Sequence, residues 1–505
     1  MPMNPVPRLA LALLLAFGTG AAFAQPKPDR PQPSQQQQQQ GPANGKGVVR
    51  LLPRDSVTDH TVVTAQGRLA YTATAGTLAF YDQSGEQSAA VFYVAYVAKD
   101  RAPNRPLTFV FNGGPGAASA FLNLGLVGPR HLELGQEAPE AGAKLADNPD
   151  TWLAFTDLVL VDPIGTGWSR TVKPDDAKNF WSVRADADAM AKAISLYVTH
   201  NDRAGAPLYL LGESYGGFRA AKVANALKRG QGINVDGIVM LSPLLEGWLT
   251  FGDDQSALRA ALQLPSLAAT HLETTSSFTR EALAAAEKFA LGDYLTTLAG
   301  APLQGAAARA FYERVAKMTG LSIDAVTQAR GFVGGGALKT LQKGKVVSRY
   351  DATFAVDDPF PEQNGSRGPD PILDGVARAY GGAFAAYARN ELGFKTEMTY
   401  TLLASDVAGR WDWGGTGRAD AGVESDLRVL LAFSPKFRVL IGSGLSDLVT
   451  PYAETRYVLD HLPPETPPGR AVLKTYRGGH MVYLDPASRK AFTADAAAFY
   501  KASGK

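Results

Sequence analysis

Short apolar runs bounded by glycine, proline and charged residues recur along the chain and predict the strands of a sheet. The first runs are rich in β-branched and aromatic residues. Separated by Gly67, Gly76 and Gly85, they predict an antiparallel meander over residues 62–63, 69–74, 78–81 and 90–97. Later runs lack polar alternation, which is typical of parallel strands buried on both faces, at residues 107–111, 158–161, 208–211, 237–241, 437–441 and 472–476. Because helical segments such as 183–199 and 219–229 lie between them, we expect an α/β fold with a mostly parallel central sheet.

The alternation of strand and helix patterns stops at about residue 245 and returns after Pro435. The stretch between is rich in alanine and has helical runs at 280–289 and 306–318. If this stretch began a separate domain, no further strands of the first pattern would be expected after it. The return of strand patterns after Pro435 therefore favours an insertion. We therefore expect a catalytic domain built from 47–244 and 431–505, with 245–430 as an inserted helical cap over the carboxyl ends of the strands.

The first residues have the features of an export signal. Arg8 supplies a positive charge, residues 9–17 are apolar, and Ala22-Phe23-Ala24 fits small-x-small cleavage. We expect residues 1–24 to be a signal peptide and the protein to be periplasmic or secreted, without stable membrane insertion, since the apolar run is too short to span a bilayer. Residues 25–46, rich in proline and glutamine, predict a disordered linker.

Composition narrows the possible chemistry. The 505 residues carry a formal net charge of +2 and no basic patch interleaved with aromatics, which argues against nucleic acid as a partner. There is no cysteine, so thiol nucleophiles and thiolate metal sites are excluded. No His-x-x-x-His or His-Glu-x-x-His pair occurs, and we expect neither a metal nor a cofactor. The oligomeric state is left open.

A nucleophile elbow is the strongest chemical signal. The apolar run 208–211 leads into Gly212-Glu-Ser-Tyr-Gly-Gly217, and a helix pattern follows at once. A serine on such a strand-to-helix turn is strained and exposed above the sheet, and the glycines leave room for the turn. Ser214 is therefore the candidate nucleophile, with the Tyr215 N–H as an oxyanion donor at the helix start.

The base must be a histidine that follows the serine, because in α/β-hydrolases the chain order is serine, acid, histidine. His271 falls in the expected cap, and His461 lies at a helix end before two prolines, as an ordinary surface histidine does. His480 follows the run 472–476 through a glycine loop. It is the candidate base.

Asp447 is the candidate for the acid that orients the base. It follows the run 437–441 through a short loop, although an Asx-type turn or helix cap is the alternative reading at this position. Asp485 is a rival, but it comes after His480 and breaks the order. A second oxyanion donor is expected at Gly114, in the glycine loop 112–116 that follows the run 107–111.

These motifs resemble those of the serine carboxypeptidases, an α/β-hydrolase family of peptidases. The resemblance spans most of the chain outside the N-terminal tail and the cap. The matching segments are Phe111-Asn-Gly-Gly-Pro-Gly116, Asn148-Pro to Trp152 with Val159-Leu-Val-Asp-Pro-Ile-Gly-Thr-Gly-Trp-Ser169, Gly212-Glu-Ser-Tyr-Gly-Gly217 and Gly479-His-Met481.

The resemblance implies further roles. Asn112 and a protonated Glu213 would bind the free carboxylate of the substrate, with help from the Gly113 N–H, and Met481 would line the pocket. A neutral Glu213 needs a raised pKa, which favours acidic working conditions. The chain departs from the family pattern at three places: Leu126 stands where a second glutamate is usual, Ala117-Ala118 where a cysteine is usual, and Tyr483 where a proline is common.

The sequence thus predicts an exported serine carboxypeptidase that acts on peptides with a free C-terminus through an acyl-enzyme on Ser214. A proline-iminopeptidase-like aminopeptidase shares the Gly-Gly-Pro-Gly motif and is the first alternative. An esterase or acyltransferase on the same fold is the second, given Leu126. A non-catalytic binding protein is disfavoured because Ser214, Asp447 and His480 are all present.

Overall fold

A ten-stranded sheet forms the centre of the fold in the computed structural model, which describes residues 45–100, 102, 104–134, 143–334, 341–362 and 369–503. The strand order is β1-β2-β3-β7-β4-β9-β10-β13-β14, and β8 pairs with β3. The strands are β1 (Ser56–Thr64), β2 (Gly67–Tyr81), β3 (Gln87–Ala98), β4 (Leu107–Phe111), β7 (Asp157–Val161), β8 (Arg170–Thr171), β9 (Leu208–Glu213), β10 (Gly237–Leu241), β13 (Arg438–Gly444) and β14 (Ala471–Tyr476).

The antiparallel meander predicted at the start of the sheet is present as β1, β2 and β3. The prediction of two separate strands on either side of Gly76 is wrong, because β2 runs through this glycine as one strand of 15 residues. A Cβ at Gly76 would lie 2.3 Å from Cγ of Asp55, so glycine is needed for the close approach of this carboxyl rather than for a turn.

Whereas β8 pairs antiparallel with β3, the strands from β7 through β4, β9, β10 and β13 to β14 are parallel to one another. Their carboxyl ends therefore meet along one edge of the sheet. Asn112 follows β4, Ser214 follows β9, and the loops after β13 and β14 carry Asp447 and His480. This topology, with helices on both faces, is the predicted α/β-hydrolase fold.

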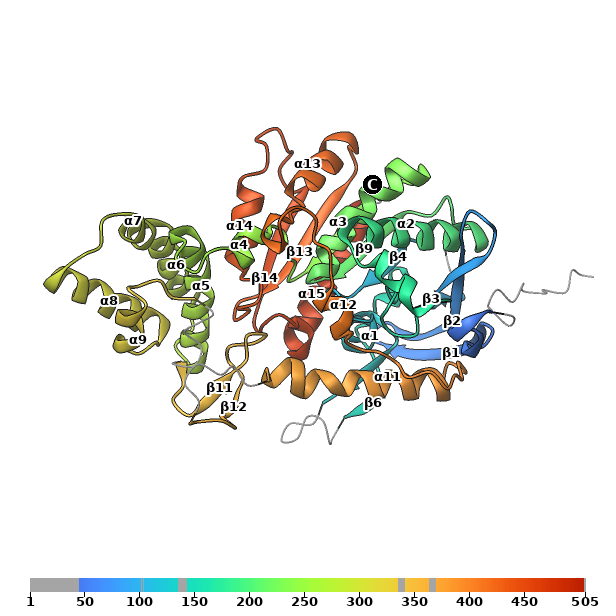
Figure 1. Ribbon diagram of the computed structural model, residues 1–505, viewed down its shortest axis with the longest axis horizontal. Helices are drawn as coiled ribbons and strands as arrows, with labels where there is room; N and C mark the ends of the chain where they lie inside the picture. Colours follow the sequence, from blue (N-terminus) through green and yellow to red (C-terminus); the bar gives the residue numbers. More distant parts are fainter. Residues whose placement is uncertain are drawn as a thin grey trace, which may run out of the picture. The chain divides into compact units, whose positions relative to one another are not determined.

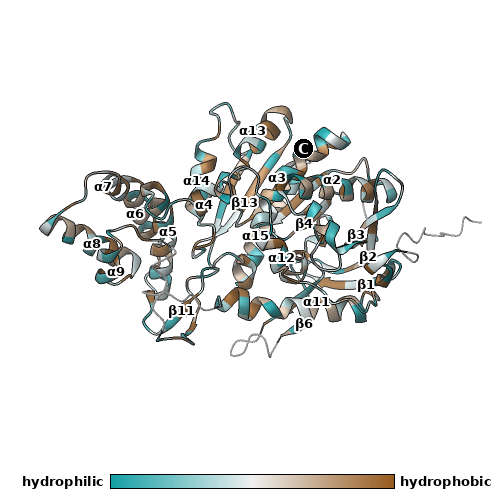
Figure 2. Cartoon of the chain, viewed as in Figure 1, coloured by the Kyte–Doolittle hydropathy of each residue, from teal (hydrophilic) through white to brown (hydrophobic). Residues whose placement is uncertain are grey.

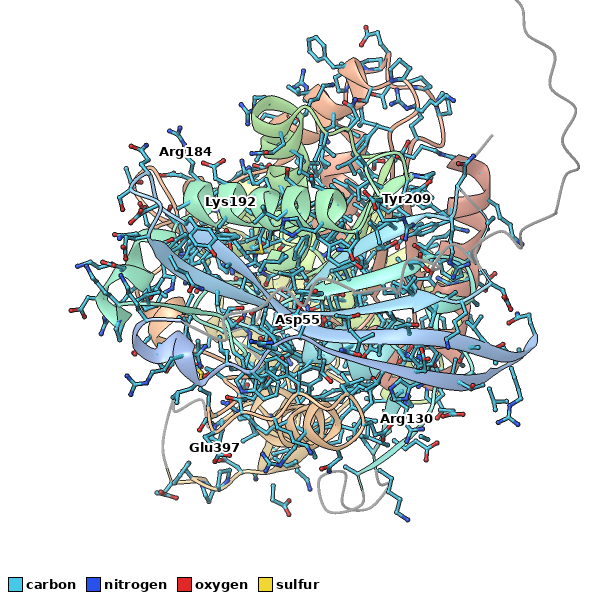
Figure 3. All side chains as sticks on the ribbon, turned by 90° about the vertical axis from the view of Figure 1, so that its right-hand side faces the viewer. Asp55, Arg130, Arg184, Lys192, Tyr209 and Glu397 are labelled. Atoms are coloured by element: carbon cyan, nitrogen blue, oxygen red, sulfur yellow. The ribbon has the colours of Figure 1, made fainter. Side chains whose placement is uncertain are left out.

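Helices cover both faces of the sheet. One face packs against α2 (Val183–His200), α3 (Tyr215–Ala226), α13 (Glu424–Phe433) and α14 (Tyr452–Asp460). The other face packs against α1 (Ala120–Leu122), α11 (Ala379–Asn390) and α15 (Pro486–Ser503). Figure 3 shows Lys192 of α2 on one side of the strands and Arg130, in the small sheet of β5 (Arg130–Glu133) and β6 (Lys144–Asp147), on the other.

The chain between β10 and β13 holds a group of helices with an apolar core of its own. Figure 1 shows this group beyond β14, and both hydropathy colours occur along its helices in Figure 2. It is joined to the sheet side through Tyr452, whose hydroxyl donates to Glu287 Oε1 at 2.6 Å. The elements of this stretch before α11 are α4 (Gly247–Phe251), α5 (Ala257–Thr274), α6 (Arg280–Phe289), α7 (Leu295–Ala299), α8 (Gly305–Thr319), α9 (Ile323–Gln328), β11 (Lys345–Val347) and β12 (Ala355–Asp357), and α12 (Ser405–Gly409) follows it.

The expected signal peptide and nearly all of the expected linker lie outside the described residues. Among the helices of the described part, none combines the length and apolar character needed to cross a bilayer.

Candidate active site

Ser214 lies on a sharp turn between β9 and α3. Its φ of 59° and ψ of −126° are rare for a residue with a side chain and mark a strained backbone. Backbone hydrogen bonds hold the turn from both sides: the Ser214 N–H donates to the Leu241 carbonyl at 2.9 Å, and the Ser214 carbonyl accepts from Gly217 and Leu244. These bonds hold the Ser214 turn at the carboxyl edge of the sheet, where the residue lines a cavity.

The glycines around Ser214 are required by close backbone contacts. A Cβ on Gly212 would lie 1.9 Å from the Gly216 carbonyl oxygen, and a Cβ on Gly216 would lie 2.5 Å from that of Phe111. No side chain fits at either distance. The Gly-x-Ser-x-Gly spacing therefore follows from how closely β9, α3 and β4 approach one another.

His480 and Asp447 are in direct contact, and both are buried. His480 Nδ1 lies 2.8 Å from Asp447 Oδ2. The other oxygen, Oδ1, accepts hydrogen bonds from the backbone N–H groups of Val449 and Thr450, at 2.8 and 3.0 Å. Asp447 is thus both the partner of the imidazole and the acceptor of an Asx-type turn, so the two readings of its sequence position coexist.

Thr450 and Tyr350 complete the surroundings of the imidazole. Thr450 Oγ1 lies 2.9 Å from Asp447 Oδ2 and 3.1 Å from His480 Nδ1. The ring of Tyr350 packs edge-on against that of His480, with centroids 5.1 Å apart. Burial lowers the pKa of His480, but the Asp447 carboxylate more than offsets it, so the net pKa lies above that of an ordinary histidine. With Nδ1 engaged by Asp447, Nε2 is the nitrogen left for proton transfer.

The two expected oxyanion donors are the backbone N–H groups of Gly114, in the loop after β4, and of Tyr215, which follows Ser214. Tyr215 is the first residue of α3, so its N–H has no acceptor within the helix. Gly114 and Tyr215 both line the cavity that contains Ser214. Gly113 brings the two loops together, since a Cβ there would lie 2.7 Å from Tyr215 N and 2.8 Å from Ser214 Cβ. Backbone N–H groups can stabilise a developing oxyanion, and the oxyanion role of Gly114 and Tyr215 stays a prediction.

Replacing Gly113 with alanine should displace Ser214 relative to its partners. Because the added methyl has no space, we expect kcat/KM to fall by about 10²-fold or more. The measurement is kcat/KM together with the thermal unfolding midpoint. Gly382→Ala is the matched control, since a Cβ at this helical glycine meets nothing within 4 Å. Equal activity of both variants would contradict the tight contact.

Asn112 and Glu213 form a buried pair beside Ser214. The Asn112 Nδ2 group donates to Glu213 Oε2 at 2.6 Å, while Asn112 Oδ1 accepts from the Leu122 N–H at 3.0 Å. The orientation of the amide is thus set from both ends, and its second N–H remains to serve a ligand. Burial raises the pKa of Glu213 to about 7, which the His480 charge partly opposes.

Tyr483, one of the residues that depart from the family pattern, also contacts Glu213. Its hydroxyl lies 3.1 Å from Glu213 Oε2 and 3.3 Å from Oε1, and donates a hydrogen bond to this carboxyl. The tyrosine ring occupies the space over Gly125, where a Cβ would lie 2.5 Å from Cε2 of the ring. Leu126 itself is buried in the core. A phenol therefore takes up part of the hydrogen bonding of Glu213.

Arg219 holds the Asn112 loop in place through a hydrogen bond to its backbone. The side chain is buried, its Nε donates to Asp186 Oδ2 at 2.6 Å, and its guanidinium donates to the Asn112 carbonyl at 2.5 Å. The guanidinium also lies over the Tyr215 ring, 5.0 Å from its centroid. One cation thus couples α2, α3 and the loop after β4, and no sequence motif indicated this role.

A cavity of about 540 Å³ opens over these groups, a size that suits a small ligand. Its lining includes all the expected substrate-binding positions, Asn112, Gly113, Glu213 and Met481, as well as Ser214 and His480. The stretch 245–430 contributes Tyr350, Arg378, Trp413 and other side chains. None of the described residues of α5 to α9 lines this cavity, because the apolar faces of these helices pack on their own core.

The rival residues lie elsewhere. His461 stacks on Tyr457 at a helix end, and His271 packs against Gly320. Asp485 Oδ1 accepts from the Ser488 N–H at 2.7 Å, near the start of α15. Within the described ranges no cluster of three or more His, Asp or Glu could hold a metal ion. Tyr350, Thr450 and Tyr483 were missed as site residues; only Thr450, three positions after Asp447, carried a local turn signal.

Residues 69–279 match the family model described as serine carboxypeptidase. "Serine carboxypeptidase-like 41" of Arabidopsis thaliana is 30% identical over 164 residues, which is 31% of this chain and 34% of that protein. "Retinoid-inducible serine carboxypeptidase" of Rattus norvegicus is 31% identical over 149 residues, 28% of this chain and 30% of that protein. The chain thus spans about a third of the length of these relatives.

Among solved structures, the proline iminopeptidase of Mycobacterium smegmatis is 16% identical with a TM-score of 0.37, over 88% of this chain and 99% of that one. A TM-score this low supports no argument about fold or function. The family match covers the loop of Asn112 and the elbow of Ser214, and it ends before Asp447 and His480, which the geometry joins to them. Over residues 69–279, which include the Asn112 loop and the Ser214 elbow, the chain is similar to the serine carboxypeptidase family.

Proposed function

We propose that this protein is a serine carboxypeptidase that removes the C-terminal residue of peptides. The observation that carries the proposal is the buried pair of Asn112 and Glu213 directly beside Ser214, in a cavity that also contains His480. This arrangement sets a carboxylate-binding group next to a nucleophile. Export, expected from residues 1–24, stays a prediction.

In the proposed reaction Ser214 Oγ attacks the carbonyl of the last peptide bond. His480 Nε2 takes the hydroxyl proton and later gives it to the leaving amino group. Asp447 holds the Nδ1–H and stabilises the imidazolium. The Gly114 and Tyr215 N–H groups stabilise the oxyanion. Water then hydrolyses the acyl-enzyme by the same route, with His480 as base.

Recognition of the terminal carboxylate is assigned to Asn112 and Glu213, with the Gly113 N–H. The free N–H of the Asn112 amide can donate to one carboxylate oxygen. Glu213 can donate to the other only while it is protonated, because two carboxylates in contact repel one another. The burial of Glu213 supports this assignment, since it keeps the proton on the carboxyl up to about pH 7.

The pH dependence of KM follows with a definite sign. Below about pH 7 Glu213 is neutral and donates; above it the carboxyl is anionic and repels the substrate. We expect KM for an N-blocked dipeptide to rise as the pH passes through about 7, while KM for the corresponding C-terminal amide stays flat. Glu213→Gln, neutral at every pH, should abolish the rise. An equal rise with the amide would contradict the role of Glu213.

The test of the proposed function compares three substrates: an N-blocked dipeptide, its C-terminal amide, and a peptide with a free N-terminus. The proposal expects strong preference for the first. Preference for the amide would favour an esterase-like or amidase-like enzyme and remove the role of Asn112 and Glu213. Release of the N-terminal residue from the third would favour the aminopeptidase alternative.

A further inference from the structure

The charge of the cavity is the starting point. Its lining contains two arginines, Arg378 and Arg418, and a single carboxyl, Glu213. This carboxyl is neutral below about pH 7 and is already bonded to Asn112 and Tyr483. The net charge of the lining is therefore positive in the state that binds substrate.

Of the two lining arginines, Arg418 is the one without a carboxylate partner among the described residues. The other, Arg378, pairs with Asp374 at 3.0 Å. Arg418 forms no ion pair with any carboxylate among the residues that the structure describes. The nearest acid in the sequence, Asp420, accepts instead from the N–H and hydroxyl of Thr416, at 2.7 and 2.5 Å.

Arg418 is held in place by its neighbours. Its guanidinium lies over the Phe251 ring, 4.5 Å from the centroid. Its backbone packs on α4, where a Cβ on Gly247 would lie 2.0 Å from the Arg418 carbonyl oxygen. The Arg418–Asp420 turn is thereby fixed against the helix that carries Phe251.

An aromatic wall connects Arg418 to the oxyanion donor. Phe251 lies 6.1 Å from Trp413, and Trp413 lies 5.4 Å from Tyr215, measured between ring centroids. All three aromatic residues line the cavity, as does Arg418. The two ring contacts and the cation–π contact thus link Arg418, step by step, to the residue that follows Ser214.

The wall is assigned to the acyl side of the proposed reaction, because the leaving residue is assigned to the other groups of the cavity. The terminal carboxylate, and with it the leaving residue, is assigned to Asn112, Glu213 and Met481. The residue before the scissile bond stays attached to Ser214 and extends toward the other part of the cavity, beside Tyr215. Its side chain is therefore the one that the wall and Arg418 contact.

We propose that Arg418 makes the site prefer peptides whose penultimate residue is acidic, aspartate or glutamate. The inference rests on the proposed carboxypeptidase function and adds the substrate class. Of the two acidic residues, glutamate has the longer side chain and therefore the greater reach toward the guanidinium. Arg418 is exposed, and an ion pair with an exposed arginine favours binding by about 2- to 5-fold.

The experiment measures kcat/KM for three N-blocked dipeptides, acyl-Glu-Phe, acyl-Gln-Phe and acyl-Lys-Phe. The wild-type protein should hydrolyse the glutamate substrate about 2- to 5-fold better than its uncharged isostere, and better still than the lysine substrate. The preference should weaken at high salt, where exposed charges are screened. Arg418→Gln should erase it, Arg418→Lys should keep part of it, and Arg418→Glu should invert it.

Arg309→Gln is the control, because this exposed arginine lies on α8, outside the cavity. Equal thermal unfolding midpoints would separate the effect from misfolding. If all three dipeptides are hydrolysed at similar rates and Arg418→Gln changes nothing, the acidic preference is wrong and the carboxypeptidase function stands. If none is hydrolysed, the proposed function itself fails, and the substrate class with it.

Discussion

Replacing Ser214 with alanine should lower kcat for peptide hydrolysis by a factor on the order of 10⁶, because removal of the nucleophile leaves only binding and the oxyanion donors. The protein should still fold, since backbone hydrogen bonds hold the turn and alanine preserves them. Alanine has a Cβ, as serine does, so the strain of the positive φ is the same in the variant. The measurement is kcat on an N-blocked dipeptide, with circular dichroism to verify the fold.

A second readout separates chemistry from binding. The Ser214→Ala variant keeps Asn112 and Glu213, so it should bind a peptide with a free C-terminus and bind the matching amide more weakly. Isothermal titration with both ligands measures this difference. Loss of a nucleophile lowers kcat by about 10⁶-fold. If the variant instead kept activity within about 10-fold of the wild type, another group would be the one that attacks the substrate.

Replacing Asp447 with asparagine should lower kcat by about 10⁴-fold. The reason lies in the turn that Asp447 caps. Two backbone N–H groups, of Val449 and Thr450, face Oδ1 and need an acceptor, so the amide oxygen should stay there. The amide nitrogen then faces His480 Nδ1 and donates to it, which moves the imidazole proton to Nε2. In this tautomer His480 cannot accept a proton from Ser214.

Asp485→Asn is the matched control. It changes the rival carboxyl, which caps the start of α15, and should leave kcat close to that of the wild type. NMR of the imidazole nitrogens reports the tautomer directly, with the proton on Nδ1 in the wild type and on Nε2 in Asp447→Asn. A large loss in Asp485→Asn with none in Asp447→Asn would reverse the assignment of the acid.

Much of the fold could be predicted because buried parallel strands are uninterrupted apolar runs. The six predicted runs all coincide with parallel strands of the sheet. The predicted strand break at Gly76 is wrong, because β2 continues through this glycine. Gly76 leaves space for the carboxyl of Asp55 instead of making a turn. Sequence alone does not distinguish a glycine that breaks a strand from one that makes space.

The expected triad members could be found because each follows a strand, and carboxyl ends of parallel strands meet at one edge. Tyr350 and Arg418 could not, because they come from the long stretch between β10 and β13, where no periodic pattern relates a residue to the sheet. Tyr483 was visible only as an unusual residue beside His480. Its contact with Glu213 depends on the space over Gly125, which only coordinates reveal.

The hydroxyl of Thr450 lies 2.9 Å from the Ser242 carbonyl oxygen, just past the end of β10, and within hydrogen-bonding distance of the Asp447–His480 pair. A single oxygen atom thus bridges three neighbouring strand ends. A sideways slip of β13 past β10 by a fraction of an ångström would pull on this bridge and tilt the imidazole. The rigidity of the sheet therefore helps to keep the His480 imidazole oriented for proton transfer.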